Sequence, residues 1–255
     1  YESWTACGYG VDTSIITGEY ILSVCNSNGT PIPLSYGQTA SGSFGVDCQI
    51  VNYSFAGSVG DVVSAVYVGP AVTRRLRILD PAGNVLAASG AGNGVGILDL
   101  VLPQNGTYRL AAEAQDNSTL GAFGVGLSVL DDGTPIAFNT LVNTSIAQFA
   151  ESDLYTFNGV SGSFVTADFS TPTVNARPDL VSRLELIRPD GTVAATNPSC
   201  GYTNRLDNIP INQNGTWTVR VRAYESWTAC GYGVDTSIIT GNYTVRVCNS
   251  ASCPP

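Results

Sequence analysis

Cysteine is the side chain in this sequence whose chemistry is easiest to specify. There are seven cysteines, none of them in a Cys-x-x-Cys pair, and there is no histidine to share a metal ion. This pattern favours disulfide bonds formed in an oxidising compartment over zinc or redox sites. The candidates for disulfide formation are Cys7, Cys25, Cys48, Cys200, Cys230, Cys248 and Cys253.

Carboxylates are the other group that could do chemistry, either as a glycosidase pair or as a calcium site. The closest groupings are Asp131 with Asp132 and Glu151 with Asp153, and neither has the alternating ligand spacing of an EF-hand loop. Solvated turn residues are the favoured interpretation, so spacing alone predicts no metal ligand.

Composition excludes most of the common enzyme mechanisms. Serine, cysteine and zinc hydrolases in their usual forms use a histidine as base or ligand, and the chain has none. A Gly-x-Ser-x-Gly elbow, a phosphate-binding loop and a dinucleotide fingerprint are also missing, and the glycine-rich stretch 90–96 is interpreted as a loop between strands. We therefore expect no enzymatic activity, no catalytic residue and no cofactor.

Asparagine offers a site for covalent modification. Seven Asn-x-Ser/Thr sequences occur, which is typical of a secreted glycoprotein, although Asn-Gly-Thr is also good turn chemistry. Both interpretations stay open at this point. The candidates for glycosylation are Asn28, Asn52, Asn105, Asn117, Asn143, Asn214 and Asn242.

The net charge of the chain limits the classes of partner that it could bind. Eleven arginines and no lysines stand against twenty acidic residues, which gives a net charge of −9 and a pI near 4.3. Nucleic acid and anionic membranes need clustered positive charge, so neither is expected as a partner. No apolar run approaches the roughly 20 residues of a membrane-spanning helix. The lack of an initiator Met and of an apolar leader suggests a mature chain or an excerpt, and an extracellular or cell-surface location is expected.

Hydrophobic periodicity predicts β-strands almost throughout and no convincing helix. Polar and apolar residues alternate in segments such as 53–55, 76–78, 108–110 and 217–221. Gly, Pro, Asn and Asp interrupt these runs about every ten residues, which is typical of sandwiches and barrels. The predicted fold class is all-β, with antiparallel sandwiches of jelly-roll type in tandem.

Internal repeats set the domain organisation. Residues 1–27 recur as 224–250 with only four differences. A weaker repeat aligns 51–68 with 153–170, and pairs Tyr108 with Trp217. The sequence Gly-Thr-Pro-Ile is read as opening both units, at Gly29 and Gly133. The predicted domains are 28–130 and 131–255, each a β-sandwich, with 1–27 as the closing hairpin of a preceding or neighbouring sandwich.

The repeat also suggests how the cysteines pair. Cys200 precedes Cys230 within the complete unit, whereas Cys7, the copy of Cys230, has no such partner in this chain. A Cys200–Cys230 bridge is therefore predicted. Cys25 is a candidate partner for Cys48 across the unit boundary, and Cys248 for Cys253 or for a residue beyond Pro255. Sequence alone leaves the connectivity open.

The pattern resembles the bacterial pre-peptidase C-terminal domain and related extracellular jelly-roll sandwiches. The resemblance is carried by 153–157, by Leu-Ile-Arg-Pro-Asp-Gly at 186–191, by Asn-Gly-Thr-Trp at 214–217 and by Gly-Asn-Tyr at 241–243. It covers both units and implies a non-catalytic role. Some such domains bind calcium near the start of the sandwich, so the resemblance makes Asp131, Asp132, Glu151 and Asp153 calcium candidates.

The aromatic residues of the repeated hairpin leave three alternatives. Tyr1, Trp4 and Tyr9, with their copies Tyr224, Trp227 and Tyr232, could pack in their own sandwich, against a neighbouring unit, or on a sugar.

Two functions follow from these features. The leading hypothesis is a structural protein of an extracellular fibre, stalk or surface layer, in which the polymer continues or copies associate with one another. In a variant of it, the N-terminal hairpin of one subunit completes the sandwich of the next. The alternative is a pair of accessory domains that hold a secreted hydrolase on its substrate or on a surface.

Overall fold

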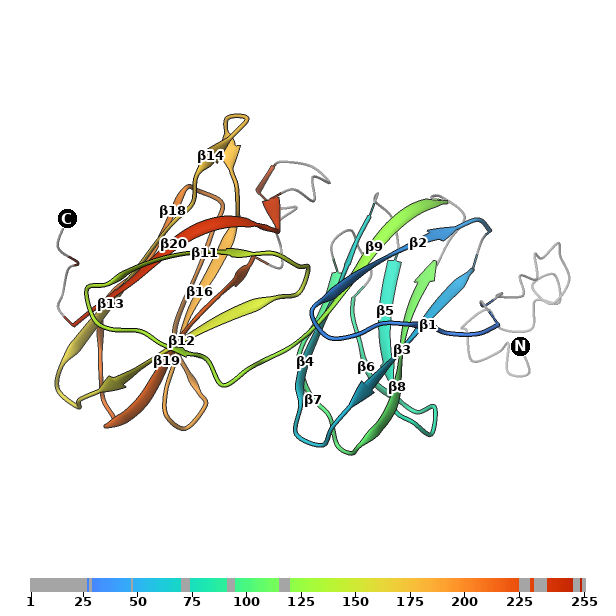
Figure 1. Ribbon diagram of the computed structural model, residues 1–255, viewed down its shortest axis with the longest axis horizontal. Coiled ribbons are helices and arrows are strands. Elements are labelled where there is room, and N and C mark those ends of the chain that lie inside the picture. Colours follow the sequence, from blue (N-terminus) through green and yellow to red (C-terminus); the bar gives the residue numbers. More distant parts are fainter. Residues whose placement is uncertain are drawn as a thin grey trace, which may run out of the picture.

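The predicted all-β class is confirmed by the computed structural model, in which every regular element is a strand or a short turn (Figure 1). The structure describes residues 27, 29–46, 48–69, 74–90, 95–114, 120–224, 230–231, 238–249 and 253. Within these ranges the strands form four main sheets and one small hairpin, which make two sandwiches in tandem. No helix in the described part of the chain is long and apolar enough to cross a membrane.

The first sandwich has a five-stranded and a four-stranded sheet. The five-stranded sheet has the order β1 (Ile32–Pro33), β3 (Ile50–Gly57), β8 (Gly106–Ala114), β5 (Arg74–Leu79), β6 (Val85–Ala88). The four-stranded sheet has the order β2 (Gln38–Phe44), β9 (Gly121–Val129), β4 (Val62–Val68), β7 (Val95–Val101). From β2 to β5, and again from β6 to β9, each connection crosses from one sheet to the other, as in a jelly roll.

The second sandwich repeats this plan. Its five-stranded sheet has the order β10 (Thr134–Pro135), β12 (Ser152–Gly159), β19 (Gly215–Ala223), β16 (Ser182–Ile187), β17 (Val193–Ser199). Its four-stranded sheet has the order β11 (Leu141–Ile146), β20 (Gly241–Cys248), β13 (Phe164–Ser170), β18 (Thr203–Pro210). A hairpin of β14 (Thr173–Val174) and β15 (Arg177–Pro178) extends from it (Figure 1).

Each sandwich has its own core, built from the inward residues of alternating strands. In β8 the inward residues Tyr108 and Leu110 are buried, and in β19 Trp217, Val219 and Val221 are buried. The predicted pairing of Tyr108 with Trp217 matches the structure, because Tyr108 lies opposite Phe55 and Trp217 lies opposite Phe157, and both side chains are buried. The Tyr108 hydroxyl donates to Gln104 O at 2.6 Å, and Trp217 Nε1 donates to Gln213 O at 3.0 Å.

One detail of the sequence alignment is wrong by two residues. The Gly-Thr-Pro-Ile matches at Gly29 and Gly133 are not equivalent, because the strand registers pair Ile32 with Tyr53 and Thr134 with Tyr155. Pro33 therefore corresponds to Pro135. The two-residue strands β1 and β10 carry too little hydrophobic pattern to fix register, so a chance match of turn residues misled the alignment.

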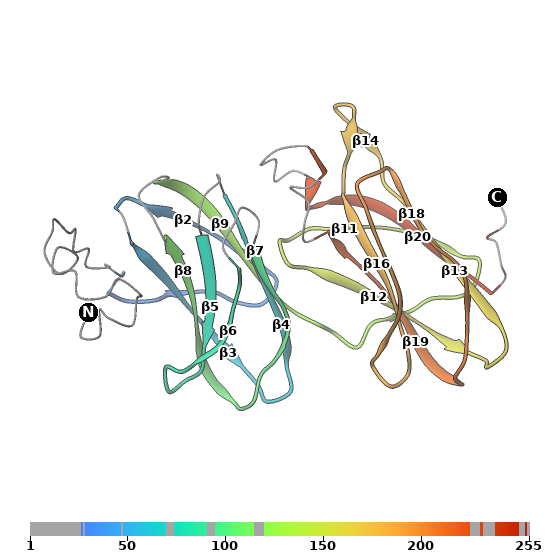
Figure 2. The ribbon, with the colours of Figure 1, turned by 180° about the vertical axis from the view of Figure 1, so that it is seen from behind.

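The second copy of the 27-residue repeat supplies β20, which lies between β11 and β13 in the middle of its sheet. Residues 1–26 of the first copy lie outside the described residues. The segment between β19 and β20 also reaches the first sandwich, as described below. In both ribbon views the sheet that contains β4 and β9 faces the second sandwich, while β13 and β18 lie on the far side of the second sandwich (Figures 1 and 2).

Candidate functional site

The junction between the two sandwiches is built on the outward face of β2, β9 and β4, here called the junction face. In β9 the residues Phe123 and Val125 point into the core, while Gly124 and Gly126 point outward. Phe149, from the turn between β11 and β12, lies on both glycines, and a Cβ added to Gly124 would stand only 2.9 Å from its ring. Glycine is required here because the backbone of the second sandwich approaches so closely.

The turn that carries Phe149, residues 147–151, has a defined shape; it is called the docking turn below. The Glu151 carboxylate accepts hydrogen bonds from Ala147 N at 2.6 Å and from Gln148 N at 2.7 Å, and Ala150 has a φ of 67°. Two polar contacts then fix it to the junction face. The Thr39 hydroxyl donates to Gln148 Oε1 at 3.0 Å, and the Ser128 hydroxyl donates to Ala150 O.

An apolar cluster covers the same boundary. It joins Val68 of the first sandwich to Val181, Ile238 and Ile239 of the second, with Tyr224 packed against them. Val181 N donates to Ile238 O at 2.8 Å, and Tyr224 N donates to Val181 O at 3.0 Å, so the backbone before β20 is held in place. Tyr224, one of the repeated aromatics, therefore contributes to packing between units. Trp227 and Tyr232 lie outside the described residues, as do Tyr1, Trp4 and Tyr9.

A buried charge network crosses the junction. On the outward face of β16 and β19, the Glu185 carboxylate forms ion pairs with Arg220 at 2.5 Å and with Arg222 at 3.2 Å. Arg220 also reaches Asp99 of the first sandwich at 2.8 Å. The side chains of Glu185 and Arg220 are each only 6% exposed. Charges this deeply buried need their partners, because an unpaired one costs several kcal/mol.

Sequence reasoning missed these residues for a definite reason. Arg220 and Arg222 alternate with buried valines in β19, a pattern that predicts a polar face in water. The same alternation also fits a polar face covered by a second domain. Phe149 is an apolar residue in a turn, which was the available signal for a contact outside its own sandwich.

The predicted calcium residues occupy several environments. Asp131 Oδ1 accepts from Gly133 N at 2.9 Å, Asp132 is exposed, and Glu151 caps the docking turn. These are local turn roles. The described residues contain no group of three or more His, Cys, Asp or Glu side chains that could hold a metal ion.

Asp153 differs from the other three. Its carboxylate accepts from the Tyr243 hydroxyl at 2.5 Å, and the Tyr243 and Tyr155 hydroxyls lie 2.7 Å apart. Burial raises the pKa of Asp153 to about 6, against the Tyr243 hydrogen bond, which lowers it. Burial and the neighbouring Asp153 also raise the pKa of Tyr243. The arrangement ties β12 to β20.

The sequons fall into different surroundings. Asn143, Asn105, Asn214 and Asn242 are exposed, whereas Asn52 is only 8% exposed. Asn28 and Asn117 lie outside the described residues. The asparagines of the two Asn-Gly-Thr segments have matching structural roles, since Asn105 Oδ1 accepts from Val59 N and Asn214 Oδ1 accepts from Ser161 N, each at 2.8 Å.

Two disulfides are described completely. Cys200 is bonded to Cys230, and Cys248 is bonded to Cys253. Cys48 also forms a disulfide. Cys7 and Cys25 lie outside the described residues, so the pairing of Cys25 with Cys48 stays a prediction.

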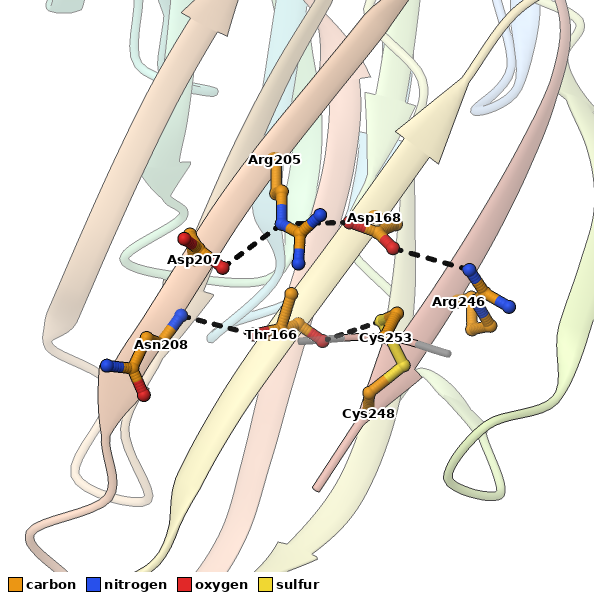
Figure 3. The surroundings of a disulfide bond; sticks show 8 residues. All are labelled: Thr166, Asp168, Arg205, Asp207, Asn208, Arg246, Cys248 and Cys253. Carbon is orange, nitrogen blue, oxygen red and sulfur yellow. Dashed lines mark hydrogen bonds and ion pairs between the residues drawn. A yellow bond between two sulfur atoms is a disulfide. The ribbon is translucent and has the colours of Figure 1, made fainter. Parts of the chain in front are cut away.

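The far side of the second sandwich carries a polar groove of about 390 Å³ on the outward face of β11, β20, β13 and β18, here called the outer face. Figure 3 shows its row of charges, in which Asp168 lies 3.3 Å from Arg205 and 3.5 Å from Arg246. Arg205 also contacts Asp207 at 3.1 Å. The Cys248–Cys253 disulfide lies beside this row (Figure 3).

Comparison with known proteins finds similarity among solved structures only: no protein-family model and no curated protein matches the chain. The pre-peptidase C-terminal domain of collagenase from Bacillus anthracis has 16% identity and a TM-score of 0.34, and covers 43% of this chain and 100% of its own. PliG of Aeromonas hydrophila, a periplasmic inhibitor of g-type lysozyme, has 13% identity and a TM-score of 0.34, and covers 42% of this chain and 100% of its own.

A protein from Eubacterium rectale described as secreted covers 87% of this chain and 80% of its own, at 13% identity and a TM-score of 0.32. These likenesses concern the sandwich fold alone. The chain is a tandem β-sandwich protein, and its disulfides are typical of an extracytoplasmic location.

Proposed function

We propose that this chain is a structural protein of an extracellular fibre, stalk or surface layer, in which tandem sandwiches form a stiff array without catalytic activity. The observation that supports this most is the junction. Domains in one chain move relative to each other unless their interface is extensive and well packed. Here apolar, hydrogen-bonded and buried ionic contacts act at the same boundary.

The connection between the sandwiches favours the same role. Only residues 130–133 separate β9 from β10, and Leu130 N donates to Val62 O at 2.9 Å, so part of this short link is hydrogen-bonded to the first sandwich. A flexible linker rich in Gly, Ser or Pro would be expected where two binding modules search for ligand independently. A short, tethered link instead transmits orientation from one unit to the next.

Electron microscopy and mass measurement of the full chain test this role. The expected result is filaments or large ordered assemblies, either of the purified chain or of the surface material from which it derives. A compact monomer at all concentrations, with no filaments and no longer precursor, would contradict the structural role.

The groove on the outer face favours a second candidate, a pair of accessory domains that bind polysaccharide or protein for a secreted hydrolase. Its lining includes Asp168, Thr203 and Arg205, side chains that can hydrogen-bond to a polar ligand. A pull-down with polysaccharide or collagen distinguishes the two functions. Retention of the parent chain and its loss in Arg205→Ala would favour the accessory role.

A further inference from the structure

Two of the Asn-x-Ser/Thr sequons lie side by side on the outer face. The segments 143–145 of β11 and 242–244 of β20 run antiparallel, with Asn143 opposite Thr244 and Ser145 opposite Asn242. We propose that these two segments form one paired glycosylation site, with an N-linked glycan on Asn143 and another on Asn242. The proposal goes beyond the structural role and does not depend on it.

Turn chemistry does not explain the asparagine in β11. Asn105 and Asn214 each hold a turn amide through the side-chain oxygen. Asn143 instead lies inside the strand Leu141–Ile146, where asparagine is disfavoured. Its side chain is exposed, and it forms no hydrogen bond or ion pair within the part of the chain that the structure describes. Asparagine at this position therefore serves neither the strand nor a turn.

Strand geometry places both sequons on one surface. Side chains two residues apart in a strand point to the same face, so the acceptor and the hydroxyl residue of each sequon lie together. In β20 the residues Tyr243 and Val245 are buried in the core, so Asn242 and Thr244 point outward. A hollow of about 340 Å³ is lined by the six residues of the two sequons and by Pro172. Both asparagines therefore border one shared hollow.

The repeated segment supplies independent evidence for the asparagine in β20. The copies 1–27 and 224–250 differ at four positions, all of which fall within β20 in the second copy. One difference, Val245 in place of Leu22, exchanges one aliphatic residue for another. The other three are the outward residues Asn242, Thr244 and Arg246, and the corresponding residues of the first copy are Glu19, Ile21 and Ser23.

Two of these outward differences are needed together for a sequon. With the residue of the first copy at either position 242 or position 244, the segment would not be an acceptor for N-glycosylation. The divergence between two otherwise identical segments thus creates a sequon, and it does so directly beside the sequon of β11. A selected use of this surface as a glycan acceptor accounts for both facts.

Asn242 can carry a glycan without losing its present contact. Its Nδ2 donates to Asp179 Oδ2 at 3.1 Å, and its backbone N donates to the same oxygen at 2.7 Å. An N-glycosidic bond replaces only one of the two hydrogens of the amide, so the other remains available to donate. The contact with Asp179 is therefore compatible with the modification.

The covalent step is the transfer of a sugar chain from a lipid-linked oligosaccharide. The asparagine Nδ2 forms a bond to C1 of the first sugar while the bond from C1 to the lipid phosphate oxygen breaks. Nδ2 loses one proton, and the lipid phosphate leaves with the electron pair of the broken bond. The step is a substitution, so it needs no oxidant and no reductant.

Glycans at this position would cover an unprotected part of the second sandwich. β11 is an edge strand of its sheet, and Leu141, which lies on the same face as Asn143, is 54% exposed. Unpaired strand edges and exposed aliphatic side chains favour unwanted association between chains. N-linked glycans are bulky and solubilising, so the paired site would keep this edge from pairing with other strands.

Glycopeptide mass spectrometry of the full chain, isolated from the surface material from which it derives, tests the proposal directly. The expected result is that the peptides containing Asn143 and Asn242 are each found with an attached glycan. Bare asparagine at both positions would overturn the proposal. A glycan on only one of the two would contradict a paired site.

Variants of the full chain, secreted from a eukaryotic host that attaches N-linked glycans, test each acceptor separately. Ser145→Ala and Thr244→Ala each destroy one sequon, so each should lower the intact mass by one glycan and the double variant by two. Ser145→Thr and Thr244→Ser keep the sequons and are the matched controls, so their glycan content should equal that of the parent. Equal glycan content in the alanine variants and their controls would show that neither asparagine is an acceptor.

The alanine change at Thr244 also removes a side-chain contact, because the Thr244 hydroxyl lies 2.7 Å from Ser170 Oγ. Asn242→Gln keeps that hydroxyl and should lose the same glycan, so it tests the acceptor if Thr244→Ala is not secreted. The proposal and the structural role fail separately. Filaments of a chain that is bare at both asparagines would reject the paired site alone, and a glycosylated chain that forms no filaments would reject the structural role alone.

Discussion

Asp153 shows how one residue can tie the behaviour of a sandwich to pH. Its surroundings raise its pKa to about 6, above the ordinary value of 3.8, chiefly because the carboxylate is half-buried. A group whose folded pKa is raised is more easily protonated in the folded state. Its ionised form therefore opposes folding, and this cost is absent below about pH 4, develops as the pH rises towards 6 and is complete above that.

Asp153→Asn should remove that cost. At pH 7.5 the variant is expected to have a free energy of unfolding about 1–2 kcal/mol higher than the parent, a figure reduced for partial solvent screening. At pH 4 the two should be equal. Chemical denaturation at both values measures the difference, and equal effects at the two pH values would contradict the prediction.

Asp190 serves as a control because its pKa is shifted in the direction opposite to that of Asp153. Hydrogen bonds from the Thr192 hydroxyl and backbone lower its pKa to about 2. Its ionised form supports folding, and that support is lost as the pH falls from about 4 towards 2. Asp190→Asn should therefore weaken the chain at pH 7.5, where Asp153→Asn strengthens it.

At the scale of elements, the two Asn-Gly-Thr segments explain how the sandwiches close at one end. Each asparagine side chain reaches from the start of a strand to the turn after β3 or β12, across 46 and 53 residues of chain. Each such bond satisfies a turn amide that the sheets leave unpaired. The identical geometry in both sandwiches indicates a structural use of this asparagine, whether or not it carries a glycan.

The two roles of Asn214 can be separated with two variants. Asn214→Ala removes the acceptor for Ser161 N and should lower the free energy of unfolding by about 1 kcal/mol. Thr216→Ala destroys the sequon and keeps the amide, and Thr216 is exposed, so it should change stability by less than about 0.5 kcal/mol. Thermal unfolding of chains from a host that attaches no glycan gives the comparison, and equal losses would argue against the turn role.

At the scale of the whole molecule, the junction decides whether the two sandwiches behave as one body. The first sandwich has glycine at positions 124 and 126, where Phe149 of the second sandwich packs closely. The second sandwich buries the charged side chains of Glu185 and Arg220 at the same junction. Neither the two glycines nor the buried charges would stabilise their own sandwich if it stood alone. Both are understandable as adaptations to a fixed neighbour.

Gly126→Leu should separate the sandwiches without unfolding them. The new side chain would occupy the space of Phe149, so small-angle scattering should show a larger radius of gyration and a broader distance distribution. Gly90→Leu is the control, since nothing lies within 4 Å of a Cβ there. Unchanged scattering in the Gly126 variant would mean that the junction tolerates the loss of this contact.

The strands and their inward faces could be predicted from the sequence, because they depend on local alternation and on turn residues near each strand, and the repeat is visible in the sequence directly. The repeat also predicted a disulfide between Cys200 and Cys230, and the structure contains that disulfide. What the outward faces contact could be seen only in the folded chain. The alternation of Val219, Arg220 and Val221 is the same whether the arginine faces water or a second sandwich, so only the folded chain could show that it is buried. The register of β1 and β10 was settled in the same way, since strands of two residues carry no pattern of their own and take their register from the neighbours they pair with.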